Sequence, residues 1–189
     1  MDRKPHLMES QIEESIVVQP NIDGLVSAML IGKKEGVPAS EVYFAKSADN
    51  YEKPGAIIVG LPYNQQATMW FDNRRHPDHS DVRGKRTDAP SCARVIFNYY
   101  RDNEEIQKYS KLVDETDRVI KSDSLDILSG LSILSFVIHN DVHNIVSRNF
   151  NRFVIHCLSM VDSNLSLSLH GILNFEAIRE RTAKYFIHY

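Results

Sequence analysis

The sequence has few or none of the features that define several large protein classes. It contains two cysteines in 189 residues, which excludes the disulfide framework of a small secreted domain. Cys92 and Cys157 each lie in an apolar segment, where a cysteine is typically a small buried side chain in a reducing compartment. Apolar runs such as residues 133–138 are far shorter than the roughly 18 residues that a membrane-spanning helix needs. We therefore expect no membrane insertion.

An excess of positive charge is also missing. Lysine and arginine together number 22 against 25 aspartate and glutamate residues, which gives a net charge of −3 at pH 7. The chain therefore offers no broad basic surface, and we expect no general nucleic-acid binding. Residues 1–14 are polar and lack the apolar stretch of a secretory signal, which predicts a cytoplasmic location.

The periodicity of apolar residues indicates an α/β protein. Short apolar runs bounded by turn-forming residues predict strands at residues 15–18, 42–45, 56–59 and 68–71. Helical spacing predicts a helix that ends at Gly36, one with Pro90 in its first turn, and others over 106–120, 131–138, 153–169 and 175–187. This order predicts a Rossmann-like, mostly parallel sheet flanked by helices, with a helical C-terminal portion. Without a Pro/Gly/Ser-rich linker, we expect a polar segment, 1–14, and a single domain, 15–189.

Polar side chains gather in three of the turns that follow predicted strands. These turns are residues 19–24, 60–62 and 72–80. In open α/β sheets, ligands bind at the carboxyl ends of the strands, because the turns there hold polar groups against a rigid scaffold. We therefore expect a site at these turns, and its first candidate ligand is a metal ion.

The order of several short motifs resembles that of the DHH phosphoesterase family, specifically its exopolyphosphatase-like branch. The motifs are Asp23-Gly24 before a helix, Leu61-Pro62, Trp70-Phe71-Asp72, and residues 89–95 and 113–117. Members of that family use a manganese-type two-metal centre to hydrolyse phosphodiesters or phosphoanhydrides, a geometry that activates water and clamps phosphate oxygens. The family's second domain, which grips the substrate, does not fit within 189 residues, and we expect it to be absent.

Most of the metal ligands that this resemblance implies are replaced in the first two motifs. The first motif of the family has His or Asp, then Asp, then Asp at alternate positions, and these positions hold Gln19, Asn21 and Asp23. The aspartate that bridges the two metals corresponds to Gly60, which has no side-chain oxygen. Of these four positions, only Asp23 keeps a carboxylate.

The motif that gives the family its name is also altered. Asp72 is retained, but Asn73 and Arg74 stand where the family has two histidines. A guanidinium stays charged at any accessible pH and repels a divalent cation. The last expected carboxylate is present as Asp117. The remaining carboxylates are too few for a two-metal cage.

Our first hypothesis is therefore a catalytically inactive DHH-like domain that serves as an interaction or structural subunit of a larger protein assembly. Its partner is another protein or a second copy of the chain. The candidate interface residues are Tyr185, Phe186 and Tyr189 near the C-terminus, because aromatic side chains are favoured anchors at interfaces. Core packing is the alternative role for these three residues.

Two further functions stay open. A manganese-dependent phosphoesterase is possible if Asp23, Asp72 and Asp117 hold metal together with His76 or His79. A phosphate- or nucleotide-binding module is possible if arginine binds the anion directly through bidentate hydrogen bonds.

The candidate anion-binding residues are Arg74 and Arg75. Against these functional roles stand structural ones: Asp23 can stabilise a helix N-terminus, Asp72 can hold its turn through backbone amides, and the arginines can belong to a solvated loop.

Overall fold

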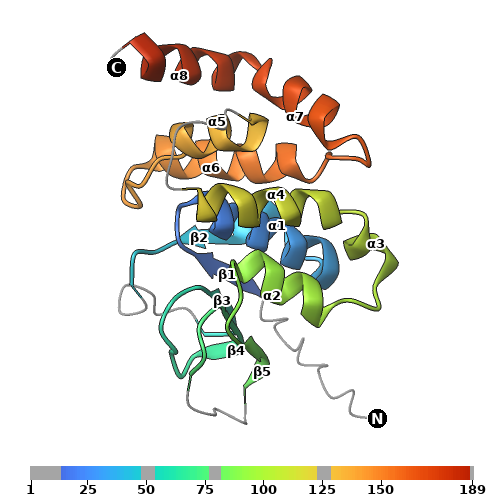
Figure 1. Ribbon diagram of the computed structural model, residues 1–189. Helices are drawn as coiled ribbons and strands as arrows, with labels where there is room; N and C mark the ends of the chain where they lie inside the picture. Colours follow the sequence, from blue (N-terminus) through green and yellow to red (C-terminus); the bar gives the residue numbers. More distant parts are fainter. Residues whose placement is uncertain (1–13, 48–53, 77–81, 123–128, 188–189) are drawn as a thin grey trace, which may run out of the picture.

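A computed structural model describes residues 14–47, 54–76, 82–122 and 129–187, without the side chains of residues 186 and 187. Five parallel strands form a sheet in the order β2-β1-β3-β4-β5 (Figure 1). The strands are β1 (Ser15–Val18), β2 (Val42–Phe44), β3 (Ala56–Val59), β4 (Ala67–Asp72) and β5 (Arg83–Arg86). The helices are α1 (Ile22–Glu35), α2 (Cys92–Tyr99), α3 (Glu104–Gln107), α4 (Ser110–Lys121), α5 (Gly130–Val137), α6 (Ile145–Leu158), α7 (Leu165–Leu173) and α8 (Glu176–Ile187), with a 3-10 turn η1 (Ala39–Glu41). The predicted parallel α/β fold is confirmed.

Several predicted element boundaries are wrong. β5 was not predicted, because its sequence is charged and its residues alternate between exposed and half-buried. The predicted helix over 153–169 is two helices, since α6 ends at Leu158 and Asn164 caps the start of α7 by accepting from the amide of Leu167. Likewise, α3 and α4 replace the single helix expected over 106–120.

The first helix has a defined beginning and end. The Asn21 side chain caps α1 by accepting from the amide of Gly24 at 2.8 Å. Lys33 and Lys34 lie in the last turn, where positive charge complements the helix dipole. Gly36 ends the helix at φ 76°, a left-handed conformation that glycine adopts readily. The predicted end of this helix is confirmed.

The two faces of the sheet are covered differently. On one face, side chains that alternate along β1, β3 and β4 share a core with α1 and α2. On the opposite face, Val17, Ile58 and Trp70 pack with residues of the connecting loops. Trp70 is buried and its indole N–H donates to the carbonyl of Leu61 at 2.9 Å. The turns that follow the strands are therefore fixed on a rigid sheet.

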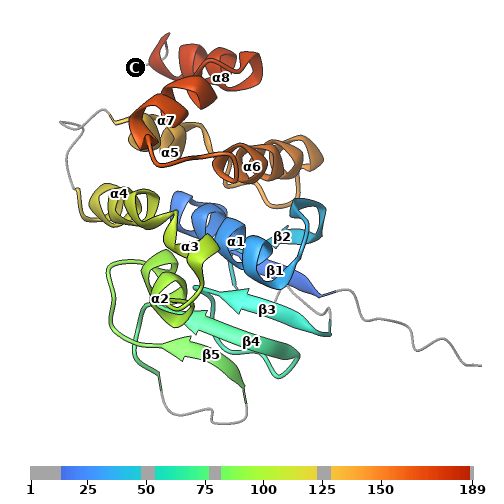
Figure 2. The same ribbon diagram turned by 90° about the vertical axis from the view of Figure 1, so that its right-hand side faces the viewer.

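The C-terminal helices are stacked in layers away from the sheet (Figure 2). In Figure 1, α5 and α6 lie above α1 and α4, and α7 and α8 form the outermost layer. The main core is continuous through these layers as far as Ile178 on α8. In the part of the chain that the structure describes, no helix has both the length and the apolar character needed to cross a membrane.

The close approach of α1 to β1 makes a first prediction at Gly24. A Cβ atom at this position would lie 2.0 Å from the backbone oxygen of Gln19. We expect Gly24→Ala to lower the free energy of unfolding by about 3 kcal/mol. The control is Gly171→Ala in α7, where a Cβ atom has no neighbour within 4 Å, and which we expect to stabilise by about 0.5–1 kcal/mol. Urea unfolding followed by circular dichroism measures both free energies of unfolding. Equal changes for the two variants would contradict the close packing of Gly24 against the backbone of Gln19.

Candidate functional site

The N-terminus of α2 binds the first retained carboxylate, Asp23. The backbone amides of Cys92 and Ala93 donate to the two carboxylate oxygens of Asp23, each at 2.9 Å. Asp23 lies in the first turn of α1, so this contact joins residues about seventy positions apart. Burial raises the pKa of Asp23 above its ordinary value, although the two amide hydrogen bonds oppose the shift. Asp23 lies in the first turn of its own helix, as expected, while Asn21 supplies the cap, and Asp23 also binds the N-terminus of α2.

The second retained carboxylate, Asp72, is bound by an arginine. Asp72 is fully buried at the end of β4. The guanidinium of Arg74 donates from Nε to Asp72 Oδ1 and from Nη2 to Asp72 Oδ2, each at 2.9 Å. The backbone amide of Arg74 donates to Oδ1 as well. The hydrogen bonds to Asp72 raise the pKa of Arg74, so the guanidinium stays charged.

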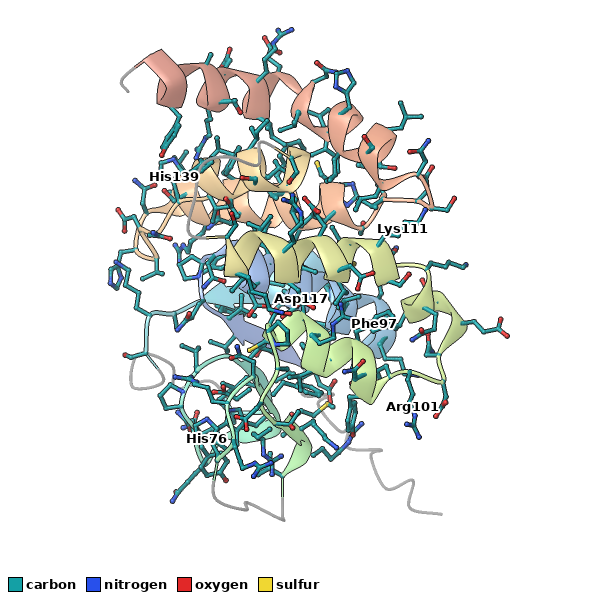
Figure 3. The ribbon with its side chains drawn as sticks, viewed as in Figure 1. His76, Phe97, Arg101, Lys111, Asp117 and His139 are labelled. Carbon is teal, nitrogen blue, oxygen red and sulfur yellow. The ribbon has the colours of Figure 1, made fainter. Side chains whose placement is uncertain are left out.

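The third retained carboxylate, Asp117, lies on α4 and faces α2 (Figure 3). The hydroxyl of Ser91 donates to Asp117 Oδ1 at 2.5 Å, and Arg94 Nε donates to Asp117 Oδ2 at 2.8 Å. Arg94 also donates to Asp114. Burial acts to lower the pKa of Arg94, but its bonds to Asp114 and Asp117 raise it overall. This carboxylate therefore also has an arginine as its counterion.

A cysteine lies beside Gly60, the position at which the family resemblance implies a bridging aspartate. Gly60 has φ 65°, and a Cβ atom built there would lie 3.2 Å from Cys92 Sγ. The thiol also donates to Asn73 Oδ1 at 3.5 Å. Burial, and next the negative charge of Asp23, raise the pKa of the Cys92 thiol, so it stays protonated and is a poor metal ligand.

Gln19 and Asn21, at two other altered positions, form local hydrogen bonds. The side-chain amide of Asn21 donates to Gln19 Oε1 at 3.2 Å, while its side-chain oxygen caps α1. Arg75 is exposed and lies 3.9 Å from the exposed carboxylate of Asp88. The structure thus places Asp23 and Asp117 in contact with residues at the start of α2, places Asp72 at the end of β4, and leaves Arg75 exposed.

His76 is the one described residue that could add a metal ligand. Its Nε2 is buried and lies 3.1 Å from Asp72 Oδ2, without hydrogen-bond geometry. The His76 ring packs on Trp70, with the ring centroids 4.8 Å apart. His79 lies outside the described residues, as does Tyr189, while Phe186 is described only by its backbone.

The arrangement does not fit a two-metal centre. Within the described ranges, no group of three or more His, Cys, Asp or Glu side chains is placed to hold a metal ion. The carboxylate oxygens of Asp23, Asp72 and Asp117 all accept from protein donors. A divalent ion would have to displace these donors and lie beside two guanidinium groups, which electrostatics opposes.

Sequence reasoning missed Ser91 and Arg94. The side chain of Ser91 caps α2 by accepting from the amide of Arg94 at 2.9 Å, so Pro90 precedes the helix instead of lying in its first turn. A serine directly before a helical apolar pattern is a recognised signal for such a cap. No sequence signal shows that Arg94 contacts Asp117, because the contact depends on how α2 and α4 pack.

The fold is an α/β domain with a five-stranded parallel sheet and a helical C-terminal part. No family model and no curated protein matches the sequence. Among solved structures, the chain is similar to a pGpG-specific phosphodiesterase, PggH from Vibrio cholerae, with 23% identity and a TM-score of 0.68. The match covers 93% of this chain and 60% of that protein. It shows the shared fold, and the chain spans well under two thirds of that phosphodiesterase.

The pairing of Arg74 with Asp72 makes a second prediction. Arg74→Met leaves a buried carboxylate without its counterion, and we expect the free energy of unfolding to fall by about 1–2 kcal/mol, a value reduced because Arg74 is 61% exposed. Arg75→Met removes only an exposed pair, and we expect a change below about 0.5 kcal/mol. Urea unfolding measures both. Equal losses would mean that Arg74 is not the counterion of Asp72.

The raised pKa of Asp23 makes a third prediction, about pH. The folded state binds a proton more tightly at this group than the unfolded state does, so stability falls as pH rises from the unfolded pKa to the folded pKa. We expect the wild type to lose stability relative to Asp23→Asn across that window, with a slope of at most about 1.4 kcal/mol per pH unit. Unfolding at a series of pH values measures this difference, with the exposed Asp102→Asn as control. Parallel curves for wild type and Asp23→Asn would refute it.

Proposed function

We propose that this chain is a catalytically inactive DHH-like domain that serves as an interaction subunit of a protein assembly. The observation that carries the proposal is that Asp23, Asp72 and Asp117 are each bound by protein donors. In the family that the sequence resembles, the matching carboxylates hold metal ions. Here the positive charge beside two of them comes from arginine.

An arginine in place of a metal ion still meets the needs of a buried carboxylate. A fully buried carboxylate such as Asp72 needs positive charge or hydrogen-bond donors nearby. A bidentate guanidinium supplies both in a planar geometry that matches the carboxylate. The pair therefore preserves the local structure while it removes the ion that would activate water.

The packing beside Gly60 supports the same proposal. An aspartate at this position would have to share space with Cys92 Sγ. Restoring the bridging carboxylate alone is therefore not expected to restore the site, because the Cys92 side chain lies close to the position that an aspartate side chain would take. In this proposal, the site differs from a metal centre in the packing of its side chains as well as in its ligands.

An interaction role explains why the domain would keep its fold without catalytic activity. Large apolar side chains are exposed on the C-terminal helices, among them Ile145, Val146 and Leu167, which are 54%, 62% and 66% exposed. Tyr185, a predicted interface residue, is half-buried and stacks on Phe136 with the ring centroids 5.2 Å apart. The partner is another protein or a second copy of the chain.

The alternative is a phosphodiesterase, and two observations favour it. The structurally similar protein is a pGpG-specific phosphodiesterase, and the buried Nε2 of His76 lies beside Asp72 without a hydrogen bond. A manganese ion held by Asp72 and His76 would first have to displace Arg74. A phosphate-binding module is less well supported, since Arg74 already uses Nε and Nη2 on Asp72.

The deciding experiment combines manganese calorimetry with hydrolysis of pGpG, a short oligonucleotide and polyphosphate. We expect no binding heat and no turnover. Binding with turnover would establish the phosphodiesterase instead, and a rise in melting temperature with phosphate would favour the binding module.

A variant with the family's ligands restored serves as the matched control for this experiment. It combines Gln19→His, Asn21→Asp, Gly60→Asp, Asn73→His and Arg74→His. We expect this variant to bind manganese only when Cys92→Ala is added, because the smaller side chain leaves room beside residue 60. Binding without the Cys92 change would contradict the steric argument.

A further inference from the structure

A groove at the opposite end of the molecule from the candidate site has an unusual combination of charge and apolar surface. It has a volume of about 380 Å³ and lies between the end of α5 and the face of α8 that carries Arg181, Lys184 and Tyr185. Its walls are mainly apolar, with Phe136 stacked on Tyr185. Figure 3 shows His139, which lines one end of the groove, far from His76 in the candidate site.

Arg181 is a half-buried cation that lacks a counterion in the described part of the chain. Its Nη1 is buried without a hydrogen-bond acceptor, and its guanidinium carbon lies 3.7 Å from the centre of the Phe150 ring. Burial lowers the pKa of Arg181. By contrast, Arg74, Arg94 and Arg118 each bind a carboxylate, and their pKa values are raised.

The groove is complementary to a negative charge. Its lining residues include Arg181, Lys184 and His139 and contain no carboxylate. The acidic residues near the groove in sequence are Glu180, which precedes Arg181 on α8 and is exposed, and Asp141, which accepts from the backbone amides of His143 and Asn144. A ligand for this groove therefore needs one carboxylate for Arg181 and an apolar group for the Phe136–Tyr185 wall.

We propose that the groove between α5 and α8 binds a peptide segment of a partner protein in which a carboxylate side chain adjoins a large apolar side chain. This inference rests on the proposed interaction role and names its surface. The carboxylate pairs with the guanidinium of Arg181 where it lines the groove, and the apolar side chain packs on Phe136 and Tyr185. A peptide fits better than a phosphorylated ligand, because the walls are apolar and one unpartnered guanidinium offers few donors for a dianion.

The stability of the free chain provides an independent test of this proposal. An unpaired, partly buried guanidinium is unfavourable for folding, and removing it without loss of the aliphatic stem relieves that penalty. We expect Arg181→Met to keep or raise the melting temperature, by about 2 °C. A clear fall in melting temperature would mean that Arg181 has a structural partner, and the proposal would be wrong.

The binding experiment pans a displayed library of random heptapeptides against the full chain. Arg181→Met is panned in parallel, and Arg179→Met, an exposed position on the same helix, is the matched control. We expect wild type and Arg179→Met to enrich peptides with an acidic residue next to a large apolar one, and Arg181→Met to lose that enrichment. Calorimetry then compares an enriched peptide with its Asp→Asn or Glu→Gln version, which we expect to bind at least tenfold more weakly.

Each other outcome overturns the proposal. No enrichment, enrichment without acidic residues, or enrichment that survives Arg181→Met would each show that the groove does not bind such a segment. Self-association that light scattering detects and Arg181→Met abolishes would assign the groove to a second copy of the chain. Manganese binding and hydrolysis test the proposed function separately, so an inactive chain with an unoccupied groove would lose only this inference.

Discussion

Two hydrogen bonds from the first turn of α2 to Asp23 connect parts of the molecule that the chain itself leaves far apart. Asp23 is placed by the turn after β1, whereas Cys92 and Ala93 follow β5, four strands further along the chain. The N-terminus of a helix favours a negative charge, and its free amides need acceptors. Because this contact fixes α2, it also fixes Ser91 and Arg94 opposite Asp117 and the Cys92 thiol beside Gly60.

Donors of the protein itself compensate each of the three carboxylates. A buried carboxylate without a counterion or donors would be unbalanced in a region of low dielectric constant. Arg74 and Arg94 supply positive charge to Asp72 and Asp117, and the amides of α2 satisfy Asp23. Local stability therefore accounts for Asp72 and Asp117, and their presence does not by itself indicate an active site.

The sequence predicted much of the sheet because its strands are short apolar runs in a regular order. It could not predict β5, where Arg83 and Lys85 point outward on a strand defined only by its pairing with β4. The strand order led us to expect the turns that hold Asp23 and Asp72 at one edge of the sheet, whereas Asp117 lies on α4, and its place depends on how the helices pack. The sequence indicated only one of the two arginine partners. Arg74 occupies a motif position, whereas the contact of Arg94 with Asp117 spans 23 residues and forms only because α2 packs against α4.

The arginines also separate the two ends of the molecule by electrostatic state. Near the carboxyl ends of the strands, the guanidinium groups of Arg74 and Arg94 are bound to carboxylates. At the far end, the half-buried Arg181 packs on Phe150 without such a partner among the described residues. The recognition surface that we propose therefore lies on the C-terminal helices, whose outermost layer Figure 1 shows, and away from the carboxylates at the edge of the sheet.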